Sequence, residues 1–276
     1  MIFLAGKTDI GKERTNNEDA VSLLQLGDGS AILLVADGMG GPDAGEVASE
    51  RAVSRIRAFF SEASLPSPDA EDSCLSQMVE QSFMEAQRAI MDYVAENPDS
   101  MGMGTTLVLL WLFHGRACLA WCGDSRCYGW NPHKGLRQLS HDHSLVQDMV
   151  DRGELSPWMA SRHPDSHIIT RCLGDTDASD ELPEVKTFPY AEGDVFLLCS
   201  DGLCGYCSSR GMEKALLAHL YDAATCCDAL IACALRAGGH DNIAVAVAWE
   251  RQSDHPYSLS VWSRLRRRLL SLFKTA

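Results

Sequence analysis

The stretch Ala31-Ile-Leu-Leu-Val-Ala-Asp37-Gly-Met-Gly-Gly41 decides how this chain folds. Six apolar residues in a row, bounded by turn-forming residues, are typical of a fully buried strand. The Asp37-Gly38 pair ends this strand abruptly at a charged side chain. The pattern therefore predicts a strand that delivers a carboxylate to one edge of the core.

Two later segments repeat this arrangement. Val195–Cys199 is an apolar run that leads through Ser200 to Asp201, and Asp241 stands just before another apolar run, residues 243–249. A buried and unpaired carboxylate costs several kcal/mol, so such groups require cations or hydrogen-bond donors. Carboxylate and carbonyl oxygens suit magnesium or manganese better than zinc. One Asp-Gly pair usually only makes a turn, but three such strand ends together favour a divalent-metal site.

Composition and charge limit the function further. The chain has 276 residues, 46% of them hydrophobic, which is ordinary for a globular protein of one large or two small domains. After Glu250 there are six basic residues and one acidic residue, which leaves residues 1–250 with 18 basic and 37 acidic residues, a net charge of −19. So acidic a surface repels phosphate backbones, which excludes nucleic acid as a partner. Without a membrane-spanning run or a signal-peptide pattern, the sequence predicts a cytoplasmic protein.

Several other motifs carry little weight. The eleven cysteines are scattered, many within apolar runs, and this favours buried reduced thiols over a disulfide framework. The Cys204-Gly-Tyr-Cys207 spacing has no second pair nearby to complete a metal site. His141 and His143 stand two residues apart and cannot share a helix face. Gly6-Lys7-Thr8 lacks the first glycine of a phosphate-binding loop and is rejected as one.

The residues before the central strand are expected to lie beside it. Residues 20–26 read as a strand, and Gly27-Asp28-Gly29 reads as a hairpin turn. This pairing brings Arg14 and the Glu18-Asp19 pair near the same edge as Asp37. A guanidinium group can hold phosphate oxygens at two points, although an arginine considered alone is more often a surface residue.

The rest of the chain alternates apolar patterns of strand and helix type. Residues 141–176 are polar and punctuated by Gly and Pro, which is typical of a mobile loop over a site. The remaining expected elements are helices from residue 42 to about 60 and over 75–95, 212–221 and 225–237, and strands over 105–113, 116–122 (which ends near Asp124), 127–130 and 243–249.

Taken in order, these segments resemble the metal-dependent serine/threonine protein phosphatases, the PPM family, in their compact bacterial form. The resemblance implies an α+β fold, a four-layer α/β/β/α sandwich with two central antiparallel β-sheets flanked by helices. It implies a catalytic domain over residues 1–250, in which 141–176 is a flap-like segment. The matching motifs are Arg14 with Asn17-Glu18-Asp19, Asp37-Gly38-Met39-Gly40-Gly41, Gly104-Thr105-Thr106, Gly123-Asp124-Ser125-Arg126, Asp142-His143-Ser144, Arg171 with Leu173-Gly174, Ser200-Asp201-Gly202, and Gly239 with Asp241-Asn242.

The resemblance also implies a role for each site residue. The cofactors would be two Mn²⁺ or Mg²⁺ ions, or three. Arg14 would hold the substrate phosphate, and Asn242 would support the site. By this resemblance Asp37 bridges two ions, Asp201 and Asp241 complete the first, the Gly38 carbonyl contacts the second, Glu18 and Asp19 lie around the second through water, and Asp124 with Asp201 holds a weaker third.

The implied reaction is hydrolysis of phosphoserine and phosphothreonine in proteins. A water bridging two cations has a lowered pKa and can attack phosphorus directly, so no covalent intermediate is needed. Eukaryotic relatives carry a histidine after the Asp-Gly pair, where this chain has Met39. The leaving-group proton must therefore come from elsewhere. A role in signalling, opposite a Ser/Thr kinase, follows from the resemblance.

Two other functions remain open at this point. One is a catalytically inactive module that binds phosphoproteins, which is disfavoured because every acidic ligand position is filled. The other is a metal-dependent hydrolase of small phosphoesters or nucleotides. Turnover of phosphopeptides compared with nucleotides would separate this hydrolase from a protein phosphatase.

The tail, residues 251–276, lies outside the resemblance. Apolar residues recur there at helical spacing beside a band of arginines, which predicts a basic amphipathic helix. Such a helix could bind an anionic surface such as the inner membrane through residues 258–274, dock on a partner protein, or fold back on the acidic body of the chain. The apolar residues are Trp262, Leu265, Leu269 and Leu272, and the basic ones Arg264, Arg266, Arg267 and Arg268.

Overall fold

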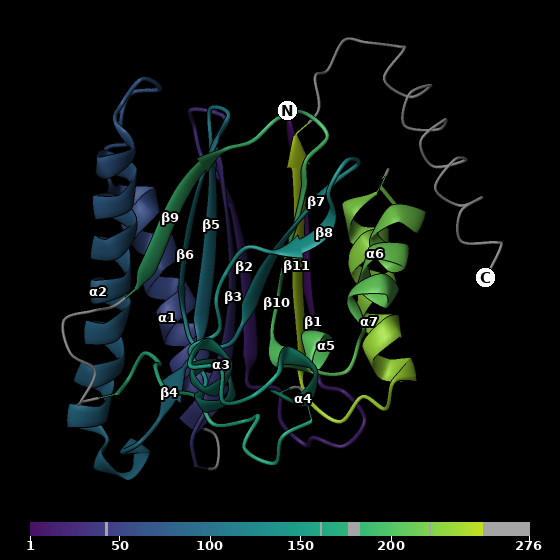
Figure 1. The fold of residues 1–276 in the computed structure, drawn as a ribbon. Coiled ribbons are helices and arrows are strands. Elements are labelled where there is room, and N and C mark those ends of the chain that lie inside the picture. The colour runs from purple at the N-terminus through teal and green to yellow at the C-terminus, as the bar shows by residue number, and fades with distance from the viewer. Residues whose placement is uncertain (42–43, 161, 176–182, 221, 251–276) are drawn as a thin grey trace, which may run out of the picture.

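A computed structural model describes residues 1–41, 44–160, 162–175, 183–220 and 222–250. Two antiparallel sheets pack face to face between two layers of helices, as Figure 1 shows, and the predicted α/β/β/α fold is confirmed. No helix in the described ranges is both long and apolar enough to cross a membrane. The helices are α1 (Ala44–Glu62), α2 (Asp72–Glu96), the short 3₁₀ helix η1 (Pro98–Ser100), α3 (Leu145–Asp151), α4 (Pro157–Ala160), α5 (Asp201–Cys204), α6 (Ser209–Ala218) and α7 (Ala223–Arg236).

One sheet has five strands in the order β1-β11-β10-β7-β8, and the other has six, in the order β2-β3-β5-β6-β9 with β4 paired to β3. The first and last strands of the chain, β1 and β11, pair along their whole length. The strands are β1 (Ile2–Asp9), β2 (Asp19–Gln25), β3 (Ala31–Met39), β4 (Gly104–Thr105), β5 (Leu107–Phe113), β6 (Arg116–Cys122), β7 (Arg126–Asn131), β8 (Gly135–Gln138), β9 (Glu184–Pro189), β10 (Val195–Cys199) and β11 (Ile243–Glu250).

The stretch 31–36 forms the buried part of β3, which lies between β2 and β5 in the six-stranded sheet. Its even-numbered side chains face α1 and α2, and its odd-numbered side chains face the other sheet. Burial on both faces explains why this strand is continuously apolar rather than alternating. The hairpin predicted at residues 27–29 joins β2 to β3, with Asp19 opposite Asp37.

The last strand shows how the two sheets come together. Along β11 the larger side chains Ile243, Val245 and Val247 face α7, whereas Ala244, Ala246 and Ala248 face the six-stranded sheet. This alternation follows from the two-residue period of a strand. Small residues on the inner face let the sheets pack closely, and the strand ends beside Asp37 and Asp241 thereby share one end of the sandwich.

Several short or partly exposed elements were not predicted from the sequence, among them β8, β9 and α5. The strands β8 and β9 form edges of their sheets and are only partly buried, so neither carries a strong apolar pattern. The helix α5 has only four residues and follows Ser200 directly, where an Asp-Gly turn was expected. All eleven cysteines are free thiols, as predicted. The tail and its predicted helix lie outside the described residues.

Candidate metal centre

Two facing aspartates mark the centre of the site. Asp37 lies near the end of β3, and Asp19 is its partner at the start of β2. The backbone of Asp37 is held by two threonines: its carbonyl accepts hydrogen bonds from Thr106 N (2.8 Å) and Thr105 Oγ1 (2.9 Å), and its amide donates to Thr106 Oγ1 (3.1 Å). The position of the Asp37 side chain is thus fixed by β4 and the residues that follow it.

The second sheet brings Asp201 to the same place. Asp201 opens α5 immediately after β10, and its negative charge helps to raise the pKa of Asp37. The preceding residue links the two sheets, because Ser200 Oγ donates to Asp19 Oδ2 (2.7 Å) and accepts from Ala244 N (2.9 Å). Residues from opposite sheets therefore meet at this end of the sandwich.

Asn242 organises the loop that carries Arg14 and Glu18. Its buried amide nitrogen donates to the carbonyls of Ile10 (3.0 Å) and Asn16 (2.9 Å), and its oxygen accepts from Glu18 N (2.9 Å). The amide of Asn242 in turn donates to Asp241 Oδ1 (2.8 Å). Four hydrogen bonds therefore tie Asn242 to this loop and to Asp241.

Asp124 reaches the centre from the loop between β6 and β7. The next residue, Ser125, shares a hydrogen bond with Thr106 (2.7 Å between the hydroxyl oxygens), which joins this loop to Asp37. On the other side, Arg126 forms hydrogen bonds to both oxygens of the buried Asp142 carboxylate (2.6–2.9 Å). The two residues that follow Asp124 are therefore each held by a side-chain partner.

Close backbone packing explains two of the glycines. A Cβ atom added to Gly38 would lie 2.0 Å from the Gly45 carbonyl oxygen at the start of α1. A Cβ atom added to Gly202 would lie 1.8 Å from the Asn242 carbonyl oxygen. No other residue fits at either position without moving the backbone, so Gly38 and Gly202 allow α1, α5 and the Asn242 loop to close around the aspartates.

The aspartates repel one another strongly. Burial raises the pKa of Asp19 to about 8, and the charges of Asp201 and Asp241 add to this rise. Burial and the carboxylate of Asp201 raise the pKa of Asp124 to about 7. The pKa values of Asp37 and Asp201 are also raised, first by burial and then by neighbouring carboxylates. This is the pattern expected where several acids share a site that lacks enough positive charge.

Arg14 is the cation nearest to this cluster on the outer side. Its Nη2 atom lies 2.9 Å from Asp241, and its side chain is half exposed. Burial alone would lower the pKa of Arg14, but Asp241, Glu18 and Asp37 together raise it. The guanidinium group therefore stands at the mouth of the site, paired with one of the predicted metal ligands.

The chemistry of these residues fits divalent cations. Asp19 Oδ1 is buried without a hydrogen-bond partner, and the raised pKa values show a need for positive charge. Within the described ranges, no group of three or more His, Cys, Asp or Glu side chains is arranged as a complete ligand set. Magnesium-like ions keep several waters and use only one or two carboxylates each, so two ions shared among these aspartates do not require such a group. In addition, the carboxylate of Asp241 is paired with the guanidinium group of Arg14.

The structure thus brings together residues that the sequence places far apart. Asp19, Asp37, Asp124, Asp201 and Asp241 act on one another electrostatically. Glu18 lies at the rim, where its side chain packs against Gly45 of α1. No role was predicted from the sequence for Ser200, Thr105, Thr106, Arg126 or Asp142. These residues lie within the motifs that carry the family resemblance, and this was the only feature of the sequence that pointed to them.

Comparison with known proteins gives a consistent result. A family model described as protein phosphatase 2C matches residues 6–237. The chain is 36% identical over 241 residues to the serine/threonine phosphatase stp of Listeria monocytogenes, covering 87% of this chain and 92% of that protein. It is 32% identical over 247 residues to the protein phosphatase PhpP of Streptococcus pneumoniae, with 90% and 97% covered.

Solved structures agree with the sequence matches. The crystal structure of the serine/threonine phosphatase PstP/Ppp of Mycobacterium tuberculosis superposes with a TM-score of 0.80 at 34% identity, covering 91% of this chain and 99% of that one. The catalytic domain of PstP in complex with two manganese ions gives a TM-score of 0.76 at 33% identity, with 90% and 97% covered.

Proposed function

This chain belongs to the protein phosphatase 2C (PPM) family and is a metal-dependent serine/threonine protein phosphatase, and we propose that Asp37, Asp201 and Asp241 hold two manganese or magnesium ions at the end of its β-sandwich. Asp37, on which the charges of the other four aspartates act, would contact both ions. The Gly38 carbonyl, Glu18 and Asp19 would serve the second ion, and Asp124 with Asp201 would serve a weaker third.

One observation carries this assignment. Asp19, Asp37, Asp124 and Asp201 come from both sheets, and burial together with neighbouring carboxylates raises the pKa of each, while the cations that act on this group include Arg14 and Arg126. The structure of PstP, a similar protein, contains two manganese ions, and this supports the assignment of a two-ion site here.

The chain's own residues have distinct tasks in the reaction. When bound, the two ions supply a water of lowered pKa for attack on phosphorus and offset charge on the phosphoryl oxygens. Arg14, at the mouth of the site, binds the phosphoryl group and stabilises the charge that develops on it. To do so it exchanges its partner Asp241 for the substrate. Met39 offers no proton, so leaving-group protonation does not involve that position.

The direct test is hydrolysis. Purified protein with added manganese should release phosphate from phosphothreonine peptides and from p-nitrophenyl phosphate, and EDTA should stop both reactions. Nucleotides should be turned over far more slowly than phosphopeptides. Equal activity with and without chelator would contradict the metal-dependent mechanism, and a preference for nucleotides would favour a small-phosphoester hydrolase.

The partners follow from the activity. The substrates are phosphorylated proteins, and we propose an opposing Ser/Thr kinase in the same signalling pathway.

For the basic tail we propose contact with an anionic membrane surface or with a protein, through residues 258–274. Sedimentation with anionic vesicles should pull down the full chain but not a chain ending at residue 250; equal partitioning of the two would exclude the membrane contact.

A further inference from the structure

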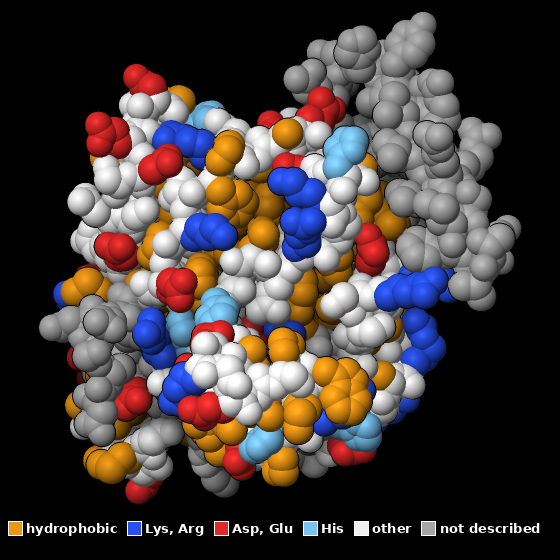
Figure 2. Space-filling view, in the orientation of Figure 1, with side chains coloured by type: hydrophobic (Ala, Val, Ile, Leu, Met, Phe, Trp, Pro, Cys, Tyr) orange, Lys and Arg blue, Asp and Glu red, His pale blue; other side chains and the backbone are white. Residues whose placement is uncertain are grey.

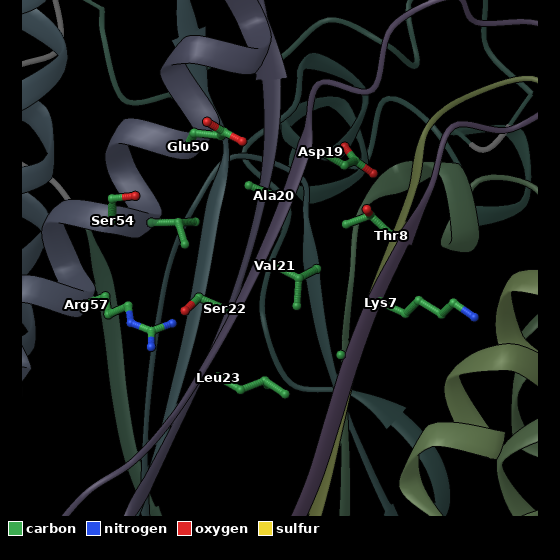
Figure 3. Close-up of a pocket in the computed structure, with 12 residues that line it drawn as sticks. Lys7, Thr8, Asp19, Ala20, Val21, Ser22, Leu23, Glu50, Ser54 and Arg57 are labelled. Carbon is green, nitrogen blue, oxygen red and sulfur yellow. The ribbon is translucent and has the colours of Figure 1, made fainter.

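A groove of about 600 Å³ runs along one edge of the sandwich, between β1, β2 and α1 (Figure 3). Residues 6–8 of β1 and 19–23 of β2 line it, together with one face of α1. A cleft that faces a sheet contacts every second residue of a strand, because successive side chains point to opposite faces. Consecutive residues line this groove, so it follows the strand edges.

Both strands are edge strands. Among the residues that the structure describes, β1 pairs only with β11, and β2 pairs only with β3. An edge strand presents a row of backbone N–H and C=O groups that can pair with another chain. The helix α1 covers one face of the six-stranded sheet, and β1 belongs to the sheet on the other face. The groove is therefore the place that one more strand beside β2 would occupy, with a helix on one side and a strand on the other.

A buried hydroxyl group points to a ligand in this groove. Ala20 and Leu24 of β2 belong to the core beneath α1 and α2, and Ser22 lies on the same face of the strand. The Ser22 side chain is buried, and its Oγ has no hydrogen-bond partner. Buried polar atoms nearly always have partners. The one other described side-chain atom of this kind is Asp19 Oδ1, where the groove meets the metal centre.

We propose that an extended segment of the phosphoprotein substrate pairs with the free edge of β2 as an additional strand. The groove ends at Asp19, whose partner in the sheet is Asp37. A segment lying along residues 19–23 thus leads into the metal centre, and for this reason the occupant is the chain that carries the phosphorylated residue. At about 3.3 Å per residue, the five β2 residues accommodate about five residues of substrate.

The charges on α1 add a preference for certain side chains. In Figure 3, Glu50 lies toward the Asp19 end of the groove and Arg57 lies toward Ser22. Lys7, on the opposite strand, is already paired with Asp228 of α7 (2.5 Å). The groove therefore suits a segment with a basic side chain near the phosphorylated residue and an acidic side chain farther along.

The first test blocks the groove without touching the metal centre. Ser54 is exposed on α1 and lines the groove, whereas Ser61 is exposed on the same helix outside it. In Ser54→Trp, KM for a phosphothreonine peptide with six residues on each side should rise on the order of tenfold. Hydrolysis of p-nitrophenyl phosphate should be unchanged, and Ser61→Trp should match the wild type with both substrates.

The inference rests on the proposed phosphatase function, and the two fail in different ways. If Ser54→Trp hydrolyses the peptide as well as Ser61→Trp does, the docking groove is wrong and the phosphatase remains. If Ser54→Trp loses both substrates equally, its effect is not on docking and the inference is also wrong. If the wild type with manganese hydrolyses neither substrate, the proposed function itself fails, and the docking groove falls with it.

A second test uses the period of strand pairing. In a paired strand only every second residue directs its N–H toward the neighbouring strand. Methylation of single backbone nitrogens along the phosphopeptide should therefore lower kcat/KM at alternate positions, by about fivefold for one lost hydrogen bond. A peptide series in which the loss shows no two-residue period would overturn the proposal.

Discussion

At the scale of single residues, the site depends on carboxylates that are unfavourable without a cation. Burial and mutual repulsion raise the pKa values of Asp19, Asp37, Asp124 and Asp201. Asp241 is in direct contact with the guanidinium group of Arg14. The aspartates that stand at the ends of apolar runs in the sequence are therefore the residues that meet at this site.

Replacing the central aspartate should abolish activity. Asp37→Asn keeps the shape of the side chain but removes its charge, so kcat should fall by at least about two orders of magnitude, as expected for loss of a metal ligand. Steady-state kinetics with p-nitrophenyl phosphate at saturating manganese measures this. Asp28→Asn, at the far end of the β2–β3 hairpin, is a matched control and should retain wild-type turnover. Full activity of Asp37→Asn would contradict the role of Asp37.

Arg14 should affect the substrate more than the metal. Arg14→Ala removes the guanidinium from the mouth of the site, so kcat/KM should fall on the order of a hundredfold, in line with the loss of one charged contact to a phosphoryl group. Manganese affinity, measured by calorimetry, should stay the same or increase, because Asp241 loses its competing partner. A large loss of manganese affinity in this variant would assign Arg14 to the metal centre instead.

The sequence indicated the acids but not what holds them. Asp37 and Asp201 could be recognised because each follows a buried apolar run. The hydrogen bond from Ser200 to Asp19 joins residues 181 positions apart, and no local pattern predicts such a pair. The Arg14–Asp241 contact, across 227 positions, was likewise beyond the reach of spacing.

At the scale of elements, predictions were accurate where burial was complete. The strands β5 and β6 and the helix α2 are within two or three residues of their expected bounds, because continuous or periodic apolar patterns define them. The strands β8 and β9 were missed because edge strands are partly exposed and mix polar with apolar residues. Pairing with β7 and β6 forms them, and this pairing is a tertiary effect.

One glycine tests how tightly the elements close around the site. In Gly202→Ala the new Cβ would meet the Asn242 carbonyl oxygen, so either α5 or the Asn242 loop must move. We expect a loss of about 1–3 kcal/mol in the free energy of unfolding, measured by urea denaturation. Gly27→Ala is the control, since a Cβ there meets no atom within 4 Å. Equal stability of the two variants would show that the close approach is not needed.

At the scale of the whole molecule, the metal centre couples stability to pH. The folded pKa values of Asp19 (about 8) and Asp124 (about 7) lie above the ordinary value of 3.8. The folded, metal-free protein therefore binds more protons than the unfolded chain, and the stability from these groups, present below about pH 4, is lost as pH rises through 7 to 8. Cations at the site would offset this loss.

The expected result is a fall in unfolding temperature between pH 5.5 and 8.5 in EDTA. Thermal unfolding followed by circular dichroism measures it, and the drop should be smaller with manganese present, because ions replace the missing positive charge. Asp37→Asn in EDTA should show a shallower pH dependence than the wild type, since one repelling carboxylate is gone. A metal-free protein that becomes more stable as pH rises over this range would contradict the coupling.

The two-ion site can be tested most directly by electron paramagnetic resonance of the manganese-loaded protein. Two ions bridged by Asp37 should give the spectrum of a spin-coupled pair, at two manganese ions per chain. In Asp37→Asn the coupled spectrum should disappear. A spectrum of isolated manganese ions, identical in the wild type and in Asp37→Asn, would contradict the central claim that carboxylates from both sheets hold a pair of ions.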